Sequence, residues 1–240
     1  MSGALSRREF AAFGWLPFLR PRHISLAGAH FRIVRNGRSR RRYLRIHGNE
    51  ETARLVLERH MEIHEGIAYI IQSQVRNIPV DGLQVDPNRM FSRDGAELSL
   101  KNLNRDTTPG QVAHALHTLD DGREHLVRAL TPPPGGLLIA LHNNSESYSV
   151  NNELEISDQT SLRQPAQPHA FFLCTDPADF ETLRNSPYNV VLQQHGPKQD
   201  DGSFSRLAAA RGIRYVNLEV RQGERERQRE MLDWAEWNLK

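Results

Sequence analysis

Short apolar stretches alternate along the chain with stretches that have the 3.6-residue periodicity of helices. The strand-like stretches, which are rich in apolar residues except for the arginines of the first, cover residues 41–46, 66–73, 136–141 and 213–218. The periodic stretches are predicted to be helices, and they begin near Thr52 or cover residues 109–130, 204–211 and 224–240. This alternation favours an α/β fold in which the strands share one sheet.

Side chains that bind metals follow three of these predicted strands. His47 and Glu50 follow the first strand, His142 follows the third, and Glu219 follows the fourth. In α/β proteins the carboxyl ends of the strands converge on one edge of the sheet, where ligands bind. We therefore expect these four side chains to lie close together, although they are far apart in sequence.

The residue types at this edge are those of a catalytic zinc site. Two histidines and one carboxylate, with a fourth position left to water, are a common Zn²⁺ ligand set, and His47, Glu50 and His142 supply it. The metal lowers the pKa of its water, and a separate carboxylate must then accept a proton from that water. We expect Glu219 to be this catalytic carboxylate.

The order of these features resembles that of the zinc carboxypeptidases and their succinylglutamate desuccinylase and aspartoacylase relatives. These proteins have an H-x-x-E pair after an early strand, an Asn-Arg pair in a short loop, a histidine that ends a middle strand and a glutamate that ends a late strand. The matching residues here are His47 and Glu50, Asn88 and Arg89, His142, and Glu219. The sequence His-Gly-Asn-Glu at 47–50 is itself typical of the desuccinylase branch.

The resemblance implies a three-layer α/β/α fold with a mixed, mostly parallel central sheet and one Zn²⁺ per chain. It also implies that Asn88 and Arg89 hold the carboxylate of the substrate, as a guanidinium can do with two parallel hydrogen bonds. An earlier arginine of the family polarises the scissile carbonyl. By its position after the second predicted strand, Arg76 is our choice for this role.

The function that the resemblance implies is that of a zinc metallohydrolase which cleaves an amide bond in a carboxylate-bearing substrate. Both a metallocarboxypeptidase acting on short or cell-wall peptides and an N-acyl amino acid deacylase remain open. The chain ends soon after Glu219, so we expect no additional C-terminal β-domain like that of the aspartoacylases, and no tyrosine matches the one that covers the carboxypeptidase substrate. These departures favour the alternative of a non-catalytic ligand-binding protein that retains the fold.

Each motif taken singly also has a purely structural interpretation. Gly48 and Asn49 are typical turn residues, and an isolated histidine or glutamate at a strand end is usually hydrogen-bonded or solvated. Two further histidine pairs have helical spacing. They are His60 with His64 and His114 with His117. Because no third ligand lies near either pair in sequence, we expect these histidines to be solvated or packing residues.

Positive charge is concentrated near the start of the chain. Residues 1–45 contain eleven arginines but one acidic residue, Glu9, while the whole chain has a net charge of +2. Several of these arginines flank Asn36 and Gly37, where we expect a hairpin at a solvated sheet edge. No aromatic residues are interspersed there for base stacking, so we expect no nucleic-acid partner. The expected partner is a small peptide or an N-acyl amino acid.

The first 29 residues are expected to form an export signal or an N-terminal extension, and residues 30–240 a single catalytic domain. Ser6-Arg7-Arg8-Glu9-Phe10 resembles a twin-arginine signal and is followed by a short apolar stretch. We expect export to the periplasm, with a cytoplasmic location as the alternative. No stretch has the roughly 18 continuous apolar residues of a membrane span. We also expect residues 144–167 to form a long loop over the site.

Overall fold

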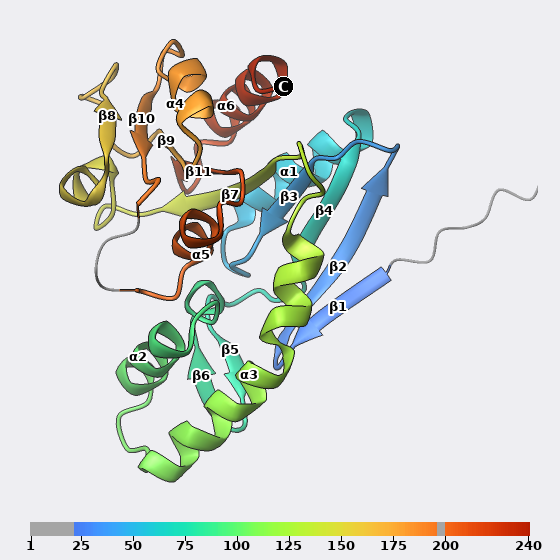
Figure 1. Ribbon diagram of the computed structural model, residues 1–240, viewed down its shortest axis with the longest axis vertical. Helices are drawn as coiled ribbons and strands as arrows, with labels where there is room; N and C mark the ends of the chain where they lie inside the picture. Colours follow the sequence, from blue (N-terminus) through green and yellow to red (C-terminus); the bar gives the residue numbers. More distant parts are fainter. Residues whose placement is uncertain (1–21, 196–199) are drawn as a thin grey trace, which may run out of the picture.

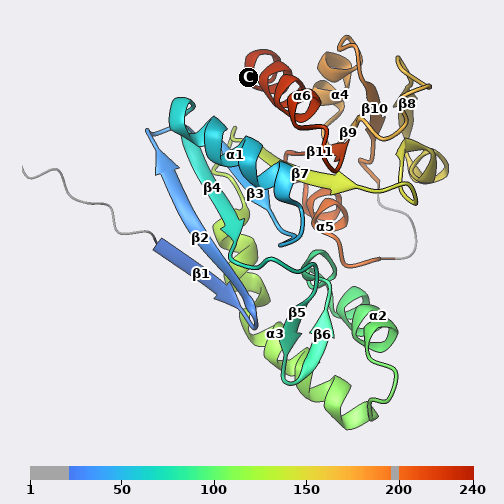
Figure 2. The same ribbon diagram turned by 180° about the vertical axis from the view of Figure 1, so that it is seen from behind.

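One large sheet organises the chain. The computed structural model describes residues 22–195 and 200–240, and Figures 1 and 2 show it from opposite sides. Within these residues nine strands form the main sheet, and two more form a separate hairpin. The nine strands are β1 (Arg22–Leu26), β2 (Ala29–Asn36), β3 (Arg42–Arg45), β4 (Gly66–Ile71), β7 (Leu138–Asn144), β8 (Gln159–Ser161), β9 (Phe171–Cys174), β10 (Asn189–Leu192) and β11 (Tyr215–Arg221).

Helices alternate with these strands along the chain. The α-helices are α1 (Glu51–Ile63), α2 (Arg93–Leu103), α3 (Pro109–Leu130), α4 (Pro177–Leu183), α5 (Phe204–Arg211) and α6 (Arg225–Asn238). Short 3₁₀ helices are η1 (Pro87–Arg89), η2 (Val150–Asn152) and η3 (Leu154–Ile156). The predicted helices at 109–130 and 204–211 are confirmed with the same bounds. Local signals fix α3, since Thr108 and Gln111 form a capping box and Pro109 occupies its first turn.

The main sheet is mixed, with a parallel centre. Its strand order is β1-β2-β4-β3-β7-β11-β9-β10-β8. The four neighbouring strands β4, β3, β7 and β11 are mutually parallel, and β1 and β8 run in the same direction as these four. The mixed, mostly parallel α/β sheet expected from the sequence is therefore confirmed.

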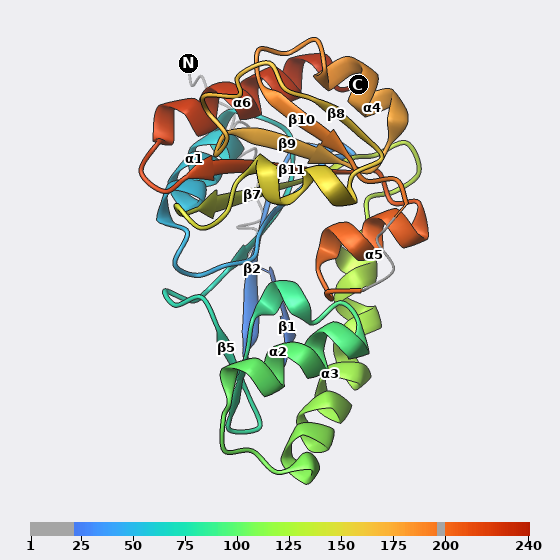
Figure 3. The same ribbon diagram turned by 90° about the vertical axis from the view of Figure 1, so that its left-hand side faces the viewer.

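Helices cover both faces of this sheet. Along β7, Leu138 and Ala140 face the core that includes residues of α3 and α5, whereas Ile139 and Leu141 face the core that includes residues of α1, α4 and α6. Figure 3 shows α1, α4 and α6 together on one side of the sheet. This is the three-layer arrangement that we expected, and it explains why the buried strands are apolar at successive positions.

A smaller lobe extends from the sheet. The hairpin β5 (Ile78–Val80) and β6 (Leu83–Val85) packs with α2 against α3, and Figure 3 shows this lobe below the main sheet. It lies between β4 and β7 in sequence. The lobe therefore supplies the loop around Asn88 without interrupting the central strands.

Three details differ from the sequence-based predictions. His142 and Glu219 lie inside β7 and β11 rather than at their ends, because the ladder between these strands continues to Asn144 and Arg221. The hairpin predicted at Asn36 is wrong, since β2 pairs with β1 and β4 and does not pair with β3. The long loop predicted over residues 144–167 is also wrong in part, because the region contains η2, η3 and the edge strand β8.

The twin-arginine motif lies outside the described residues. β1 begins at Arg22 and pairs with β2, so the sheet includes part of the segment that we assigned to an N-terminal extension. None of the helices within residues 22–195 and 200–240 is both long and apolar enough to cross a membrane.

Candidate metal centre

Three neighbouring strands bring the predicted metal site together. β7 lies between β3 and β11 in the sheet. His47 and Glu50 lie in the short segment that joins β3 to α1, and His142 lies on β7. Glu219 is the register partner of His142 on β11. The expected convergence of residues far apart in sequence is therefore present at the centre of the sheet.

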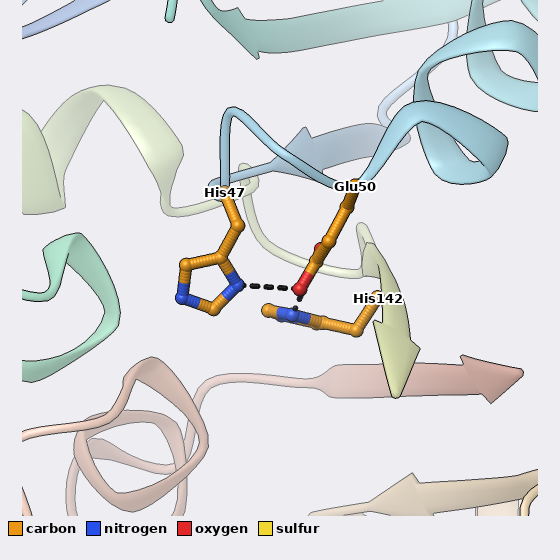
Figure 4. Close-up of side chains that lie close together, drawn as sticks. All are labelled: His47, Glu50 and His142. Carbon is orange, nitrogen blue, oxygen red and sulfur yellow. Dashed lines mark hydrogen bonds and ion pairs between the residues drawn. The ribbon is translucent and has the colours of Figure 1, made fainter. Parts of the chain in front are cut away.

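The His47, Glu50 and His142 side chains point toward one another, as Figure 4 shows. His47 Nδ1 lies 2.7 Å from Glu50 Oε1, and His142 Nδ1 lies 3.4 Å from Glu50 Oε2. The two imidazole rings meet edge to face with a centroid separation of 5.1 Å. One ligand atom from each residue lies within 4.8 Å of the other two. All three residues are buried.

The ligand atoms of these three side chains are better satisfied by a metal ion than by their contacts with one another. Glu50 Oε2 is buried and has no hydrogen-bond partner among the described residues. Such an orphaned carboxylate oxygen is costly unless a cation or a donor occupies the space beside it. Two imidazole nitrogens and one carboxylate are also the ligand types that Zn²⁺ uses in catalytic sites.

Asp86 is a partner of the site that the sequence did not predict. His47 Nε2 lies 2.9 Å from Asp86 Oδ1, so both ring nitrogens of His47 face carboxylate oxygens. Carboxylates commonly orient metal-binding histidines through the nitrogen that does not bind the metal. We infer that Asp86 holds the proton on Nε2 and leaves Nδ1 to face Glu50. The only sequence signal was its place two residues before Asn88.

The charges of this cluster stabilise one another. Burial alone would lower the pKa of His47, but Glu50 and Asp86 outweigh it and raise the pKa to about 9. Burial would likewise raise the pKa of Glu50, but the imidazoles of His47 and His142 hold it well below its usual range. Without metal, His47 is thus a protonated imidazolium that donates to two carboxylates.

Zinc binding is therefore expected to displace a proton from His47. Below about pH 9 the imidazolium must lose its Nδ1 proton before it can bind metal, so affinity for zinc should rise by about tenfold per pH unit between roughly pH 6 and pH 8. Zinc titrations at several pH values test this. Asp86→Asn should flatten the slope near pH 8 and weaken binding by about 10–100-fold. Wild-type affinity that does not change over this range would contradict the assignment.

Close packing of the backbone explains the glycine in the His-Gly-Asn-Glu motif. A Cβ atom built on Gly48 would lie 2.4 Å from the backbone oxygen of Val75 and 2.6 Å from the carbonyl carbon of Ser73. The backbone of the segment after β4 thus packs directly against the loop of residues 47–50. Gly48 is needed for this contact and not for a positive φ angle, which it does not have.

Arg45 holds the loop of residues 47–50 in position, a role that was not predicted from the sequence. Its side chain is almost fully buried, and the guanidinium donates hydrogen bonds to the carbonyls of Gly48, Glu50 and Ile71. A single side chain therefore fixes both ends of the turn between His47 and Glu50 relative to β4.

Replacing Arg45 with methionine is expected to lower the free energy of unfolding by about 2–3 kcal/mol, because buried carbonyls lose their donor. Chemical denaturation measures this change. Arg32→Met is the matched control. The Arg32 ion pair with Glu58 is exposed to 31%, so its loss should cost less than about 1 kcal/mol. Equal effects of the two substitutions would show that Arg45 has no special supporting role.

Asn143 connects the two ligand-bearing segments. Its Oδ1 accepts a hydrogen bond of 2.8 Å from the backbone N–H of Ala53 in the first turn of α1. Its amide nitrogen donates to Gln228, which itself donates to the backbone carbonyl of His142. Glu50 is the N-cap residue of α1 but makes no capping hydrogen bond. Asn143 therefore supplies the cap that Glu50 cannot supply while its carboxylate faces the histidines.

Glu219 lies beside the three candidate ligands but is held by other groups. Asn217 Nδ2 donates to its Oε1 at 3.1 Å, and Asn144 Nδ2 donates to its Oε2 at 3.2 Å. Burial and the neighbouring Glu50 charge raise its pKa, against the opposing effects of His142 and the two amides. A carboxylate with a raised pKa is suited to accept a proton near neutral pH.

Arg76 lies at the mouth of the cluster. Its guanidinium nitrogen lies 3.6 Å from Glu50 Oε1, and its Nε donates to Asp86 Oδ2 at 3.1 Å. The side chain is 45% exposed, so the guanidinium is accessible from solvent. An arginine therefore lies beside the candidate ligand Glu50, while its role toward a substrate stays a prediction.

Asn88 and Arg89 occupy different surroundings. Asn88 Oδ1 accepts a hydrogen bond from the backbone N–H of Phe204, so this oxygen helps to hold the start of α5. Arg89 forms an ion pair of 3.0 Å with Asp201. Arg76, Asp86 and Arg89 all line a cavity of about 290 Å³. This cavity is lined by Asp86, the partner of His47, and by none of the three candidate ligands.

Tyr148 is a further, half-buried group close to the site, and no role was assigned to it from the sequence. Its hydroxyl donates to Glu153 Oε1 at 2.8 Å. Burial, together with the negative charges of Glu219 and Glu153, raises its pKa well above the usual value. Tyr148 is therefore a neutral hydroxyl near Glu219, in a segment whose sequence has no periodicity that could have predicted this position.

Comparisons with known proteins found similar solved structures but no sequence match. No protein-family model and no curated protein matched the chain. A succinylglutamate desuccinylase/aspartoacylase from Rhodobacter sphaeroides is 14% identical, with a TM-score of 0.43, over 88% of this chain and 59% of that one. The product-bound ectoine utilization protein EutE (DoeB) from Ruegeria pomeroyi is 15% identical, with a TM-score of 0.47, over 85% of this chain and 59% of that one.

A succinylglutamate desuccinylase from Silicibacter sp. TM1040 is 14% identical, with a TM-score of 0.45, over 88% of this chain and 60% of that one. The chain thus spans about three fifths of the length of these three structures. The expected resemblance to this family is found among solved structures. At these identities it says nothing about activity, which depends on the chain's own side chains.

Proposed function

We propose that the protein is a zinc-dependent hydrolase that cleaves an amide bond in a carboxylate-bearing substrate. The observation that carries this proposal is the meeting of His47, Glu50 and His142, whose ligand atoms lie within 4.8 Å of one another. Glu219 lies beside them as a fourth group that binds none of the other three through a hydrogen bond. This combination supplies metal ligands and a separate proton acceptor.

His47, Glu50 and His142 would hold the ion, and Asp86 would orient His47. When bound, zinc polarises a carbonyl and lowers the pKa of a coordinated water. Glu219 would accept a proton from the attacking water and return it to the leaving amine, for which its raised pKa is suitable. Asn144 and Asn217 would keep its carboxylate in position during both transfers.

The two arginines of the adjoining cavity would bind the negative charges of the substrate. Arg76, which lies beside Glu50, would stabilise the oxyanion that develops at the scissile carbonyl. Arg89 would exchange its exposed pairing with Asp201 for the substrate carboxylate. Both a short peptide with a free C-terminus and an N-acyl amino acid have a carboxylate near an amide bond, and both therefore fit this arrangement.

An activity screen with defined metal content tests the proposal. Purified protein is stripped with a chelator, divided, and one half is reloaded with one equivalent of zinc. Both halves are then assayed on short peptides and N-acyl amino acids for release of a free amine. We expect release by the zinc-loaded half and background rates from the stripped half. Equal rates in the two halves, or no release from any substrate, would refute a zinc hydrolase.

A ligand-binding protein without catalytic activity is the second candidate. The ion pair between Arg89 and Asp201 and the use of Asn88 Oδ1 by α5 favour it, because both residues are occupied by the protein itself. This candidate predicts saturable binding of an acyl amino acid, measured by calorimetry, together with no turnover at any zinc concentration.

A further inference from the structure

A second group of metal-binding side chains lies at the far end of α1. His60, His64 and Glu236 each offer a ligand atom within 4.8 Å of the other two. His60 and His64 belong to the last turn and the C-cap of α1, while Glu236 comes from the last turn of α6. His60 lies ten residues after Glu50, or about 15 Å along the helix. The two clusters are therefore separate sites.

One buried nitrogen of this second cluster is available to a cation. His60 is buried, and its Nε2 has no hydrogen-bond partner among the described residues, although it lies 3.6 Å from Glu236 Oε2. The rings of His60 and His64 stack with their centroids 4.1 Å apart, and one ligand atom of each ring lies within 4.8 Å of the other and of a Glu236 oxygen. An unpartnered buried imidazole nitrogen beside a carboxylate is the arrangement that a metal ion satisfies.

The carboxylate is held in position by two other groups. Tyr43 donates to Glu236 Oε2 at 2.8 Å, and Arg41 pairs with Glu236 Oε1 at 3.1 Å. An ionised carboxylate oxygen can accept in two directions, so the Tyr43 contact leaves one direction of Oε2 open. Arg41 opposes a cation by its charge, and we therefore expect weaker metal binding here than at the first centre.

The ends of two helices favour positive charge at this place. His60 and Glu236 lie in the last turns of α1 and α6, and these two helices contact each other. The C-terminal end of a helix carries a partial negative charge, which stabilises a nearby cation. The two helix ends thus offset part of the repulsion from Arg41.

We propose that His60, His64 and Glu236 form a second site for a divalent transition metal such as Zn²⁺, which links the C-terminal ends of α1 and α6. Both helices cover the same face of the sheet, and α1 begins directly after the ligand Glu50. A metal at this site would stabilise the packing of α1, independently of any chemistry at the first centre.

Zinc content of single-site variants tests this proposal. Protein is equilibrated with zinc, dialysed against a weak chelator and measured for bound metal. We expect two zinc ions per chain in the wild type, one in His64→Ala, one in His142→Ala and none in the double variant. His117→Ala, which removes a 73% exposed histidine on α3, is the matched control and should retain both ions.

Each other outcome has a definite meaning. A folded His64→Ala protein with wild-type zinc content, or a His142→Ala protein with no zinc, would overturn the second site. If His64→Ala holds no zinc while His142→Ala holds one, the second site stands and the proposed catalytic centre fails. If His64→Ala does not fold, Glu236→Gln replaces it, with the same single ion expected.

Thermal unfolding gives a readout that does not depend on activity. In the His142→Ala protein, free zinc at about 100 times the dissociation constant should raise Tm by about 5–10 °C, because metal that binds only the folded state stabilises it. Adding His64→Ala should abolish this rise. A rise that persists without His64 would contradict the proposed ligand set.

Discussion

Glu219→Gln is expected to reduce kcat for amide hydrolysis by about 10²–10⁴-fold, the usual contribution of a positioned proton acceptor. Zinc content should stay the same, because Glu219 is not one of the three residues whose ligand atoms meet. The fold should also tolerate the amide. The buried Oδ1 atom of Asn217 has no hydrogen-bond partner among the described residues and can accept from it once the Asn217 amide rotates.

The control for this experiment is an exposed carboxylate in the segment that follows β7. Glu146→Gln changes a glutamate that is 81% exposed and pairs with Arg221, and it should keep nearly full activity. The measurement is steady-state hydrolysis of the best substrate from the screen, together with zinc content. If Glu219→Gln hydrolyses the substrate at the wild-type rate, the proposed proton acceptor is wrong.

His142→Ala is expected to have the second large effect, namely the loss of metal from the first centre. It removes one of three protein ligands, so affinity there should fall by more than about 100-fold, beyond the effect of changing an outer partner of a ligand. Hydrolysis should fall to background. Glu50 would then lose the imidazole 3.4 Å from its Oε2, and circular dichroism is needed to show that the sheet is retained.

Zinc titration in competition with a chromophoric chelator measures this loss. His117→Ala serves again as the control, since His117 lies on α3 and is exposed. A His142→Ala protein that binds zinc at the first centre as tightly as the wild type would exclude His142 as a ligand. If the His142→Ala protein loses activity but retains both ions, His142 has a role other than metal binding.

The central strands and the candidate ligands could be predicted because their signals are local. Buried parallel strands require continuous apolar stretches, and 66–71 and 136–141 have them. The order of strands cannot be read from such stretches. The prediction that His47, His142 and Glu219 meet depended on the general convergence of strand ends, and β3, β7 and β11 do lie side by side.

The supporting residues could not be predicted because their partners are distant in sequence or are backbone atoms. Asp86 lies 39 residues after His47, on a loop of the smaller lobe. Arg45 binds three backbone carbonyls, which have no sequence signature. The hairpin at Asn36 was mispredicted for a related reason. Its turn residues are locally favourable, but β2 and β3 both pair with β4, which follows them in sequence.

Glu236, the third residue of the second cluster, could not be predicted from the sequence either. We expected His60 and His64 to lack a further ligand because none lies near them in sequence. Glu236 lies close to them only because α6 returns to pack against α1. A helical histidine pair therefore cannot be judged from its own segment, since the nearest carboxylate can come from any helix on the same face of the sheet.

Anomalous diffraction from a zinc-soaked crystal, recorded at the zinc absorption edge, tests the central claim most directly. We predict a peak bonded to His47, Glu50 and His142, at about 2.0–2.1 Å from each histidine nitrogen and about 2.0–2.2 Å from the carboxylate oxygen. A crystal that shows no peak among these three side chains, and in which the imidazoles of His47 and His142 turn away from each other, would contradict the account.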